Sequence, residues 1–197
     1  SFLAAAHHAT LCQAEGARII RSMNSKLKTG STFSCSHIDP FSMDPLDIAA
    51  ANKVDALLNR MFIEPLTGLG YPINDLRVLQ RMEPFIKDGD EQKLSCDLDF
   101  IGVQNYTREV AAHSYLTPLL QAKIIKADAR NAERTLMNWE VYPESIYHIL
   151  KKFSRYKTIK EIIVTENGAA FHDHVEDGHI NDLQRRQYLQ EYLFQVL

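Results

Sequence analysis

Apolar residues recur along this chain at two periods, and the alternation of those periods predicts the order of its elements. Mixed three- and four-residue spacings of apolar positions indicate helices, and short apolar or β-compatible runs indicate strands. The predicted helices span residues 2–23, 44–62, 143–156 and 181–197. The predicted strands span residues 31–36, 98–103 and 159–165.

The segments between these elements are predicted mostly as loops. Residues 37–40 read as a loop after the first strand, and 64–93 are punctuated by Pro and Gly, with a short helix around 75–87. Residues 108–137 show no strong period and are interpreted as a long excursion, and a polar loop is expected up to about residue 179. Asp182 is the expected cap of the last helix.

The order α-β-α-β-α-β-α predicts an α/β fold built from right-handed βαβ units around a parallel sheet. A doubly wound sheet and a (β/α)8 barrel are the two architectures that compete. Three strands are too few for either one as an independent domain, and a barrel typically takes about 250 residues. Residues 1–197 would therefore belong to a larger fold, and part of a (β/α)8 TIM barrel is one arrangement that fits them. A nucleotide-binding domain is disfavoured because neither glycine-rich phosphate-binding motif occurs.

Charge and cysteine content narrow the function classes. Lys plus Arg is 22 and Asp plus Glu is 25, which leaves a net charge of −3 and no broad basic field for nucleic acid. No run approaches about 18 apolar residues, so no membrane span is expected. Three cysteines lie far apart without a Cys-x-x-Cys pair, which disfavours a disulfide framework and a structural zinc site. A cytoplasmic location is the simplest interpretation, with the periplasm as the alternative.

Glu166 ends the most informative run in the chain. Residues 162–165 are strand formers, and Asn167 with Gly168 tolerates positive φ and turns the chain away. A barrel places its chemistry at the C-terminal ends of its strands, where this carboxylate is predicted to lie. The structural alternative is a solvated carboxylate at a strand end, followed by a turn. A hairpin through Asn167 and Gly168 is disfavoured because the residues that follow do not alternate.

Residues 162–170 read Ile-Ile-Val-Thr-Glu-Asn-Gly-Ala-Ala and resemble the nucleophile signature of glycoside hydrolase family 1, the β-glucosidase family. Further segments resemble the same family in the same order, and together they cover essentially the whole chain. These segments are Ala-Ala-His-His at 5–8, Asn-Arg-Met-Phe-Ile-Glu-Pro-Leu at 59–66, Gly-Tyr-Pro at 70–72, the strand at 97–107 and Asn-Trp-Glu-Val-Tyr-Pro at 138–143. The resemblance implies a barrel portion from about the fourth helix to the seventh helix, with strands five to seven present.

The resemblance also implies roles for four residues. Glu166 would be the nucleophile, Tyr106 would hydrogen-bond it and keep it oriented, and Trp139 would be an aromatic platform for the leaving group. Without the resemblance, a core Trp139 and a rim-packing Tyr106 are the favoured interpretations. Gln104 stands where the family commonly has an Asn facing the sugar. Its side chain is longer than that of Asn, so its amide would reach a different point in the sugar site. Met61 replaces a family Trp, which indicates a tolerant core position.

The implied activity is that of a retaining β-glycosidase acting on β-linked glucosides or oligosaccharides, which needs two carboxylates and no metal or organic cofactor. The family's second carboxylate follows an Asn in an Asn-Glu-Pro motif, and neither Glu64-Pro65 nor Glu83-Pro84 has that context. Both ends of the sequence look cut, so the remainder of the barrel is expected to be required. The alternative is a catalytically incomplete product that at most binds carbohydrate. A metal site in one loop, formed by His172, Asp173, His174, Asp177 and His179, is disfavoured because the spacing fits no common zinc signature.

Overall fold

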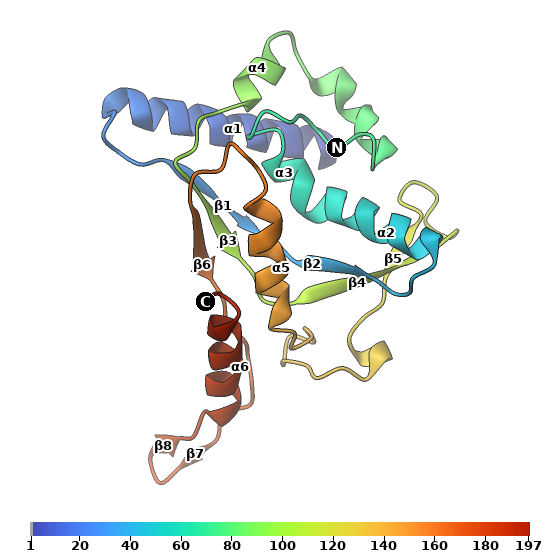
Figure 1. Ribbon diagram of the computed structural model, residues 1–197, viewed down its shortest axis with the longest axis vertical. Helices are drawn as coiled ribbons and strands as arrows, with labels where there is room; N and C mark the ends of the chain where they lie inside the picture. The colour runs from blue at the N-terminus through green and yellow to red at the C-terminus, as the bar shows by residue number, and fades with distance from the viewer. Residues whose placement is uncertain (1) are drawn as a thin grey trace.

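Helices and strands alternate along the computed structural model, which describes residues 2–197 (Figure 1). The α-helices are α1 (Phe2–Met23), α2 (Pro45–Asp55), α3 (Met61–Ile63), α4 (Asp90–Leu94), α5 (Glu144–Phe153) and α6 (Leu183–Phe194). A π-helical turn, η1 (Ala56–Arg60), joins α2 to α3, and 3-10 helices occupy η2 (Arg77–Phe85) and η3 (Asp128–Arg130). The strands are β1 (Gly30–Ser34), β2 (His37–Pro40), β3 (Phe100–Gln104), β4 (Arg108–His113), β5 (Ala122–Ile124), β6 (Ile162–Glu166), β7 (Val175–Glu176) and β8 (His179–Ile180).

The three predicted strands form one parallel sheet in the order β1-β3-β6. Each pair of neighbouring strands is connected through helical segments, as right-handed βαβ units require. The parallel order and the intervening helices confirm the predicted α/β class. Because parallel strands share their direction, the carboxyl ends of β1, β3 and β6 lie at the same edge of the sheet.

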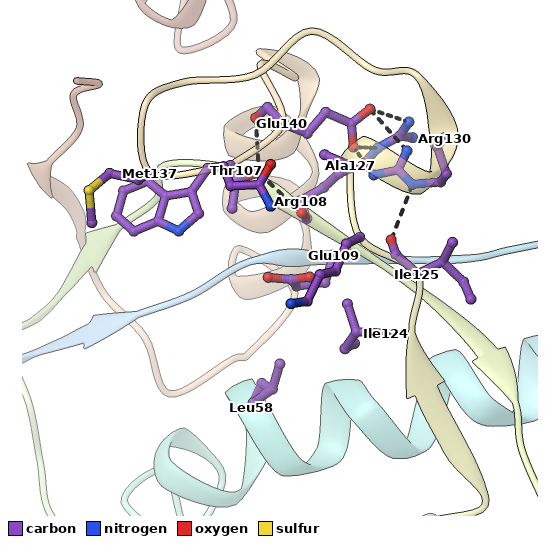
Figure 2. A pocket seen from close by; sticks show the side chains of 13 residues that line it. Leu58, Thr107, Arg108, Glu109, Ile124, Ile125, Ala127, Arg130, Met137 and Glu140 are labelled. Atoms are coloured by element: carbon purple, nitrogen blue, oxygen red, sulfur yellow. Dashed lines mark hydrogen bonds and ion pairs between the residues drawn. The ribbon is translucent and has the colours of Figure 1, made fainter. Parts of the chain in front are cut away.

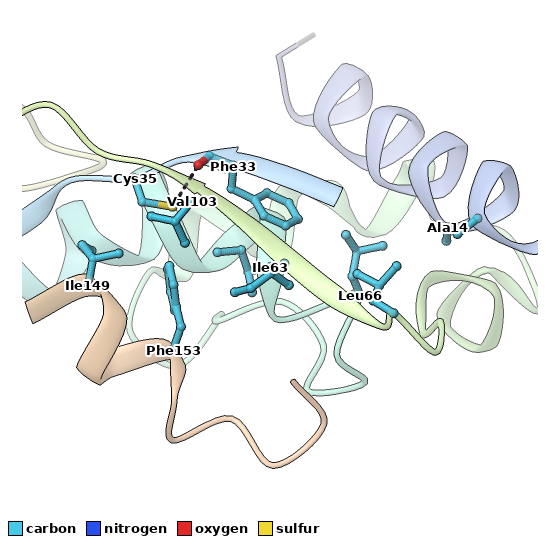
Figure 3. Close-up of a cluster of buried hydrophobic side chains, with 11 residues drawn as sticks. Ala14, Phe33, Cys35, Ile63, Leu66, Val103, Ile149 and Phe153 are labelled. Atoms are coloured by element: carbon cyan, nitrogen blue, oxygen red, sulfur yellow. Dashed lines mark hydrogen bonds between the residues drawn. The ribbon is translucent and has the colours of Figure 1, made fainter. Parts of the chain in front are cut away.

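The main core lies between this sheet and the helices on one of its faces (Figure 3). Phe33 from β1 and Val103 from β3 contact the buried side chains of Ile149 and Phe153 from α5. Ala14 and Ala17 let α1 approach closely because their side chains are small. Along β6, Ile162 and Val164 pack toward the helices. The alternating side chains Ile163 and Thr165 are exposed on the opposite face.

A second sheet, in the order β2-β4-β5, extends from the carboxyl ends of the first and was not predicted. Residues 37–40 and 108–137 were expected as loops, but β2 pairs in parallel with β4, and β5 pairs antiparallel with β4. Helix α2 covers one face of this sheet through small residues, including Ala50 and Ala51 against Ala111. The short strands gave no sequence signal because alanines and charged residues replace the usual alternation of large apolar side chains.

Helix boundaries follow the predicted ones, with local differences. Asp44 caps α2 by accepting a hydrogen bond from the Leu46 amide, as its position before Pro45 predicts. Asp182 occupies the N-cap position of α6, but its carboxylate pairs with Arg185 and makes no capping bond. The short helix expected around 75–87 is 3-10 rather than α, with Pro84 inside it. The loop expected to reach residue 179 contains the small β7–β8 hairpin.

Candidate active site

Glu166 is the last residue of β6 and lies at the carboxyl edge of the parallel sheet. The pairing of β3 with β6 shifts register just before this point, from Val103 opposite Val164 to Gln104 opposite Glu166. Thr165 is therefore an extra residue on β6, which is the pattern of a β-bulge. A bulge re-aims the side chain that follows it, so this irregularity helps set the direction of the Glu166 carboxylate.

Both carboxylate oxygens of Glu166 accept hydrogen bonds from residues on the neighbouring strand end. Gln104 Nε2 donates to Oε1 over 3.0 Å, and the Tyr106 hydroxyl donates to Oε2 in a short contact. Burial of Tyr106, its hydrogen bond to Glu166 and the negative charge of that carboxylate raise the pKa of Tyr106 to about 12. The phenol therefore keeps its proton and remains a donor to the carboxylate at neutral pH.

Trp139 lies beside this pair. Its ring centroid is 5.3 Å from that of Tyr106, with the two planes tilted by 37°. A tight hairpin carries Trp139: the Thr135 amide donates to the Trp139 carbonyl over 2.9 Å, and the Val141 amide donates to the Glu133 carbonyl. The structure therefore brings together all four predicted site residues, which come from the end of β3 and the loop after it, the end of β6, and the hairpin before α5.

An ion-pair network anchors the hairpin next to Trp139 (Figure 2). The Glu140 carboxylate accepts hydrogen bonds from the guanidinium groups of Arg108 and Arg130, and its side chain is only 7 % exposed. Arg108 also pairs with Asp39 over 2.9 Å and stacks on the Tyr142 ring at 3.7 Å. Burial opposes ionisation of Glu140, but the two arginines outweigh it and lower its pKa. The sequence pattern indicated no role for Arg108, Arg130 or Glu140.

A cavity of about 310 Å³ is lined in part by Arg108, Arg130 and Glu140 and shares Trp139 with the site. Glu166 does not line it. The lining residues are Leu58, Thr107, Arg108, Glu109, Ile124, Ile125, Lys126, Ala127, Arg130, Met137, Asn138, Trp139 and Glu140. Burial in this wall raises the pKa of Glu109.

Acid stability is expected to depend on Asp39. Burial would raise the pKa of Asp39, but hydrogen bonds and charges from His37 and Arg108 lower it from 3.8 to about 2. A lowered folded-state pKa contributes stability above the unfolded-state pKa, and that stability is lost as pH falls toward 2. In urea denaturation of the protein with its barrel complete, Asp39→Asn should be less stable than the wild type near pH 6. The difference in the free energy of unfolding between the two proteins should shrink as pH falls toward 2. A difference that does not change with pH would contradict this prediction.

The structure also shows where the histidines of the disfavoured metal site and the two glutamates followed by proline lie. Among residues 2–197, no group of three or more His, Cys, Asp or Glu side chains is arranged to hold a metal ion. His172 and His174 are exposed, and Asp173 between them pairs with Arg185. Glu64 lies directly after α3 and Glu83 lies within η2, so neither ends a strand. No helix in this described part of the chain is long and apolar enough to cross a membrane.

Relatives of known sequence match nearly the whole chain. The family profile of glycosyl hydrolase family 1 matches residues 1–197. β-Glucosidase A of Acetivibrio thermocellus is 30 % identical over 199 residues, which cover 98 % of this chain and 44 % of that protein. A 6-phospho-β-galactosidase of Clostridium acetobutylicum is 25 % identical and is covered to 46 %. The chain thus spans less than half the length of the relatives it matches.

Solved structures agree with this result. The family 1 β-glucosidase of Thermotoga maritima superimposes with a TM-score of 0.88 at 27 % identity, over 98 % of this chain and 43 % of that one. The psychrophilic β-glucosidase BglU of Micrococcus antarcticus gives 0.88 at 29 % identity, over 98 % and 46 %. The fold is part of a (β/α)8 barrel, which was one of the two architectures that the element order allowed and the one that the family resemblance implied. On this combined evidence, the chain belongs to glycosyl hydrolase family 1.

Proposed function

We propose that this chain supplies the nucleophile of a retaining β-glycosidase that hydrolyses β-linked glucosides or related glycosides. The observation that carries the proposal is the position of Glu166 at the carboxyl end of β6, with Gln104 and Tyr106 each donating to one carboxylate oxygen. Two donors hold the carboxylate in one orientation, so its oxygen is aimed before substrate arrives. Membership of glycosyl hydrolase family 1 supports the same reaction class.

The proposed reaction has two displacements. In the first, a Glu166 oxygen bonds to the anomeric carbon while the bond from that carbon to the leaving oxygen breaks, and a general acid protonates the leaving oxygen. In the second, water attacks the anomeric carbon, the same acid group accepts the water proton, and the bond to Glu166 breaks. Tyr106 stays protonated throughout and donates to Glu166 whenever the carboxylate is free.

Trp139 and Gln104 are proposed to contact the substrate. The flat apolar face of Trp139 suits the C–H face of a sugar or the ring of an aryl leaving group. The Gln104 amide has a donor and an acceptor, and its contact with Glu166 places it at the edge of the sugar site. No metal or organic cofactor enters either displacement.

The general acid is proposed to come from the remainder of the barrel, which this chain requires. Glu64 and Glu83, the two glutamates followed by proline, do not end strands. The exposed face of β6 at Ile163, and the exposed Leu193 and Phe194 of α6, suit contact with further barrel elements. The missing second carboxylate also favours an alternative, in which the 197-residue chain is catalytically incomplete and at most binds carbohydrate.

The three cysteines of the chain form no disulfide, which suits the cytoplasmic location expected from the sequence.

The 197-residue chain is expected to behave poorly when expressed alone. Strands β1 and β6 each pair on one side within residues 2–197, and open edges of buried strands promote association. Light scattering after size exclusion should show aggregates or oligomers, and thermal unfolding should lack a cooperative transition. A monomer of 22.5 kDa that unfolds cooperatively would contradict the requirement for further barrel elements.

The stereochemistry of hydrolysis tests the proposed function in the protein with its barrel complete. Proton NMR during cleavage of an aryl β-glucoside should detect the β-anomer of the sugar first, because two displacements retain configuration. First appearance of the α-anomer, or no cleavage of any β-glycoside in a substrate panel, would overturn the proposal and favour the non-catalytic alternative.

A further inference from the structure

Two tyrosines of α6 donate hydrogen bonds to one backbone atom next to the site. Tyr188 and Tyr192 are four residues apart and therefore share a face of the helix. Both are 1 % exposed, and their rings stack with centroids 4.2 Å apart. The Tyr188 hydroxyl lies 2.8 Å from the carbonyl oxygen of Tyr106, and the Tyr192 hydroxyl lies 2.9 Å from it. A carbonyl oxygen has two lone pairs, so these hydroxyls use its full accepting capacity.

The same tyrosines join the other parts of the site. Asn167, the residue after Glu166, donates through Nδ2 to the Asn105 carbonyl over 2.8 Å and to the Tyr188 hydroxyl over 3.2 Å. The Asn105 amide donates to the Glu166 carbonyl over 3.1 Å. The Tyr142 amide, three residues after Trp139, lies 3.4 Å from the Tyr192 hydroxyl and donates to it. The ends of β3 and β6 and the Trp139 hairpin are thus tied to one pair of hydroxyls.

We propose that Tyr188 and Tyr192 are positioning residues, whose hydroxyls hold the Tyr106 backbone so that its phenol meets the Glu166 carboxylate. The inference rests on the proposed function, because it explains how the nucleophile is kept aimed. Neither hydroxyl donates to Glu166, so both act through neighbouring residues: Tyr192 through Tyr106, and Tyr188 through Tyr106 and Asn167. Stacked tyrosines suit this task because they have few rotatable bonds and are packed in a buried cluster with Ile146 and Phe171.

The two hydroxyls share one acceptor, so their effects should not add. With either hydroxyl removed, the other still donates to the Tyr106 carbonyl, and a single Tyr→Phe change should lower kcat/KM about twofold to threefold. With both removed, the carbonyl loses both donors and the strand end can shift. A misplacement of about 1 Å at a catalytic group can reduce the rate about a hundredfold, so the double variant should lose between tenfold and a hundredfold.

The test uses Tyr188→Phe, Tyr192→Phe and the double variant in the protein with its barrel complete. The first readout is the pKa of Tyr106, followed by NMR of 13C-labelled tyrosine and assigned with Tyr106→Phe. The second readout is kcat/KM on an aryl β-glucoside. Tyr156→Phe is the matched control, because its hydroxyl also donates a hydrogen bond, to Glu64 over 2.9 Å, away from the site.

Tyr188 itself helps to raise the Tyr106 pKa, so Tyr188→Phe alone should lower that pKa slightly. We expect the double variant to lower it further than Tyr188→Phe does, because the bond to Glu166 weakens, with the stated loss of kcat/KM, while Tyr156→Phe leaves both unchanged. If the wild type cleaves no glycoside but the Tyr106 pKa still falls further in the double variant than in Tyr188→Phe, the proposed function fails and the positioning role stands. If the wild type is active and the double variant keeps both values, the positioning role is overturned. If the double variant does not fold, single variants that change kcat/KM no more than Tyr156→Phe does, instead of the expected twofold to threefold, also overturn it.

Discussion

Glu166→Gln is expected to reduce kcat/KM on β-glucosides by about 10⁴-fold to 10⁶-fold, the range seen when a covalent nucleophile is removed. The amide is too weak a nucleophile to form the glycosyl-enzyme, so in the first displacement nothing attacks the anomeric carbon. The variant should fold normally, because Glu166 is exposed, Gln104 can still donate to the new amide oxygen, and the Tyr106 hydroxyl can accept from the new amide nitrogen. Steady-state kinetics with an aryl β-glucoside and a circular dichroism melt measure both effects.

Glu161→Gln is the matched control for this prediction. Glu161 directly precedes β6 at the opposite end of the strand from Glu166, and it pairs on the surface with Lys28. An exposed pair of this kind contributes little to stability, so the variant should keep nearly full activity. Residual activity of Glu166→Gln within tenfold of the wild type, once wild-type contamination has been excluded, would show that Glu166 is not the nucleophile.

Glu140→Leu is expected to destabilise the protein by about 3 kcal/mol, in the range measured when one partner of a buried ion pair is removed. The change leaves Arg130 with no carboxylate partner among the described residues and Arg108 with Asp39 alone. Because Glu140 follows Trp139 directly, the freed hairpin should also weaken binding of the leaving group and raise KM for aryl glucosides. Urea denaturation and steady-state kinetics report the two effects separately.

Glu133→Leu supplies the comparison on the same hairpin. Glu133 is exposed, and its backbone carbonyl, which accepts from the Val141 amide, is unaffected by the substitution. This variant should stay within about 0.5 kcal/mol of the wild type, as surface substitutions usually do. Equal losses of stability for Glu133→Leu and Glu140→Leu would mean that the arginine contacts of Glu140 do not stabilise the fold.

The strands of the parallel sheet could be predicted because burial between layers selects continuous runs of strand formers. Residues 98–103 and 159–165 have such runs, and they correspond to β3 and β6 with shifts of one to three residues at their ends. Strands β4 and β5 could not be predicted. Their inward positions, Ala111 and Ala122, are small because α2 packs closely against them, so the usual contrast of large apolar and polar side chains is absent.

In the candidate site too, features set by neighbouring residues could be predicted, whereas contacts between residues far apart in the sequence could not. The place of Glu166 at a strand end could be predicted because a strand, a carboxylate and a turn follow one another in sequence, whereas its role came only from the resemblance of residues 162–170 to the family signature. Contacts between residues far apart leave no such trace: Arg108 and Glu140 are separated by 32 positions, and Tyr106 and Tyr192 by 86. The spacing of Tyr188 and Tyr192 indicates one helix face, but only the folded chain identifies the Tyr106 carbonyl as their acceptor.

The most direct test of the central claim, that Glu166 becomes covalently bound to the sugar, is mass spectrometry after incubation with an activated 2-deoxy-2-fluoro-β-glucoside. The fluorine slows the second displacement, so a glycosyl-enzyme formed in the first should accumulate. In the protein with its barrel complete, we expect one fluoroglucosyl group per chain, located by peptide mapping on Glu166. A label on another residue, or continued turnover of β-glucosides without any label, would contradict the assignment of Glu166 as the nucleophile.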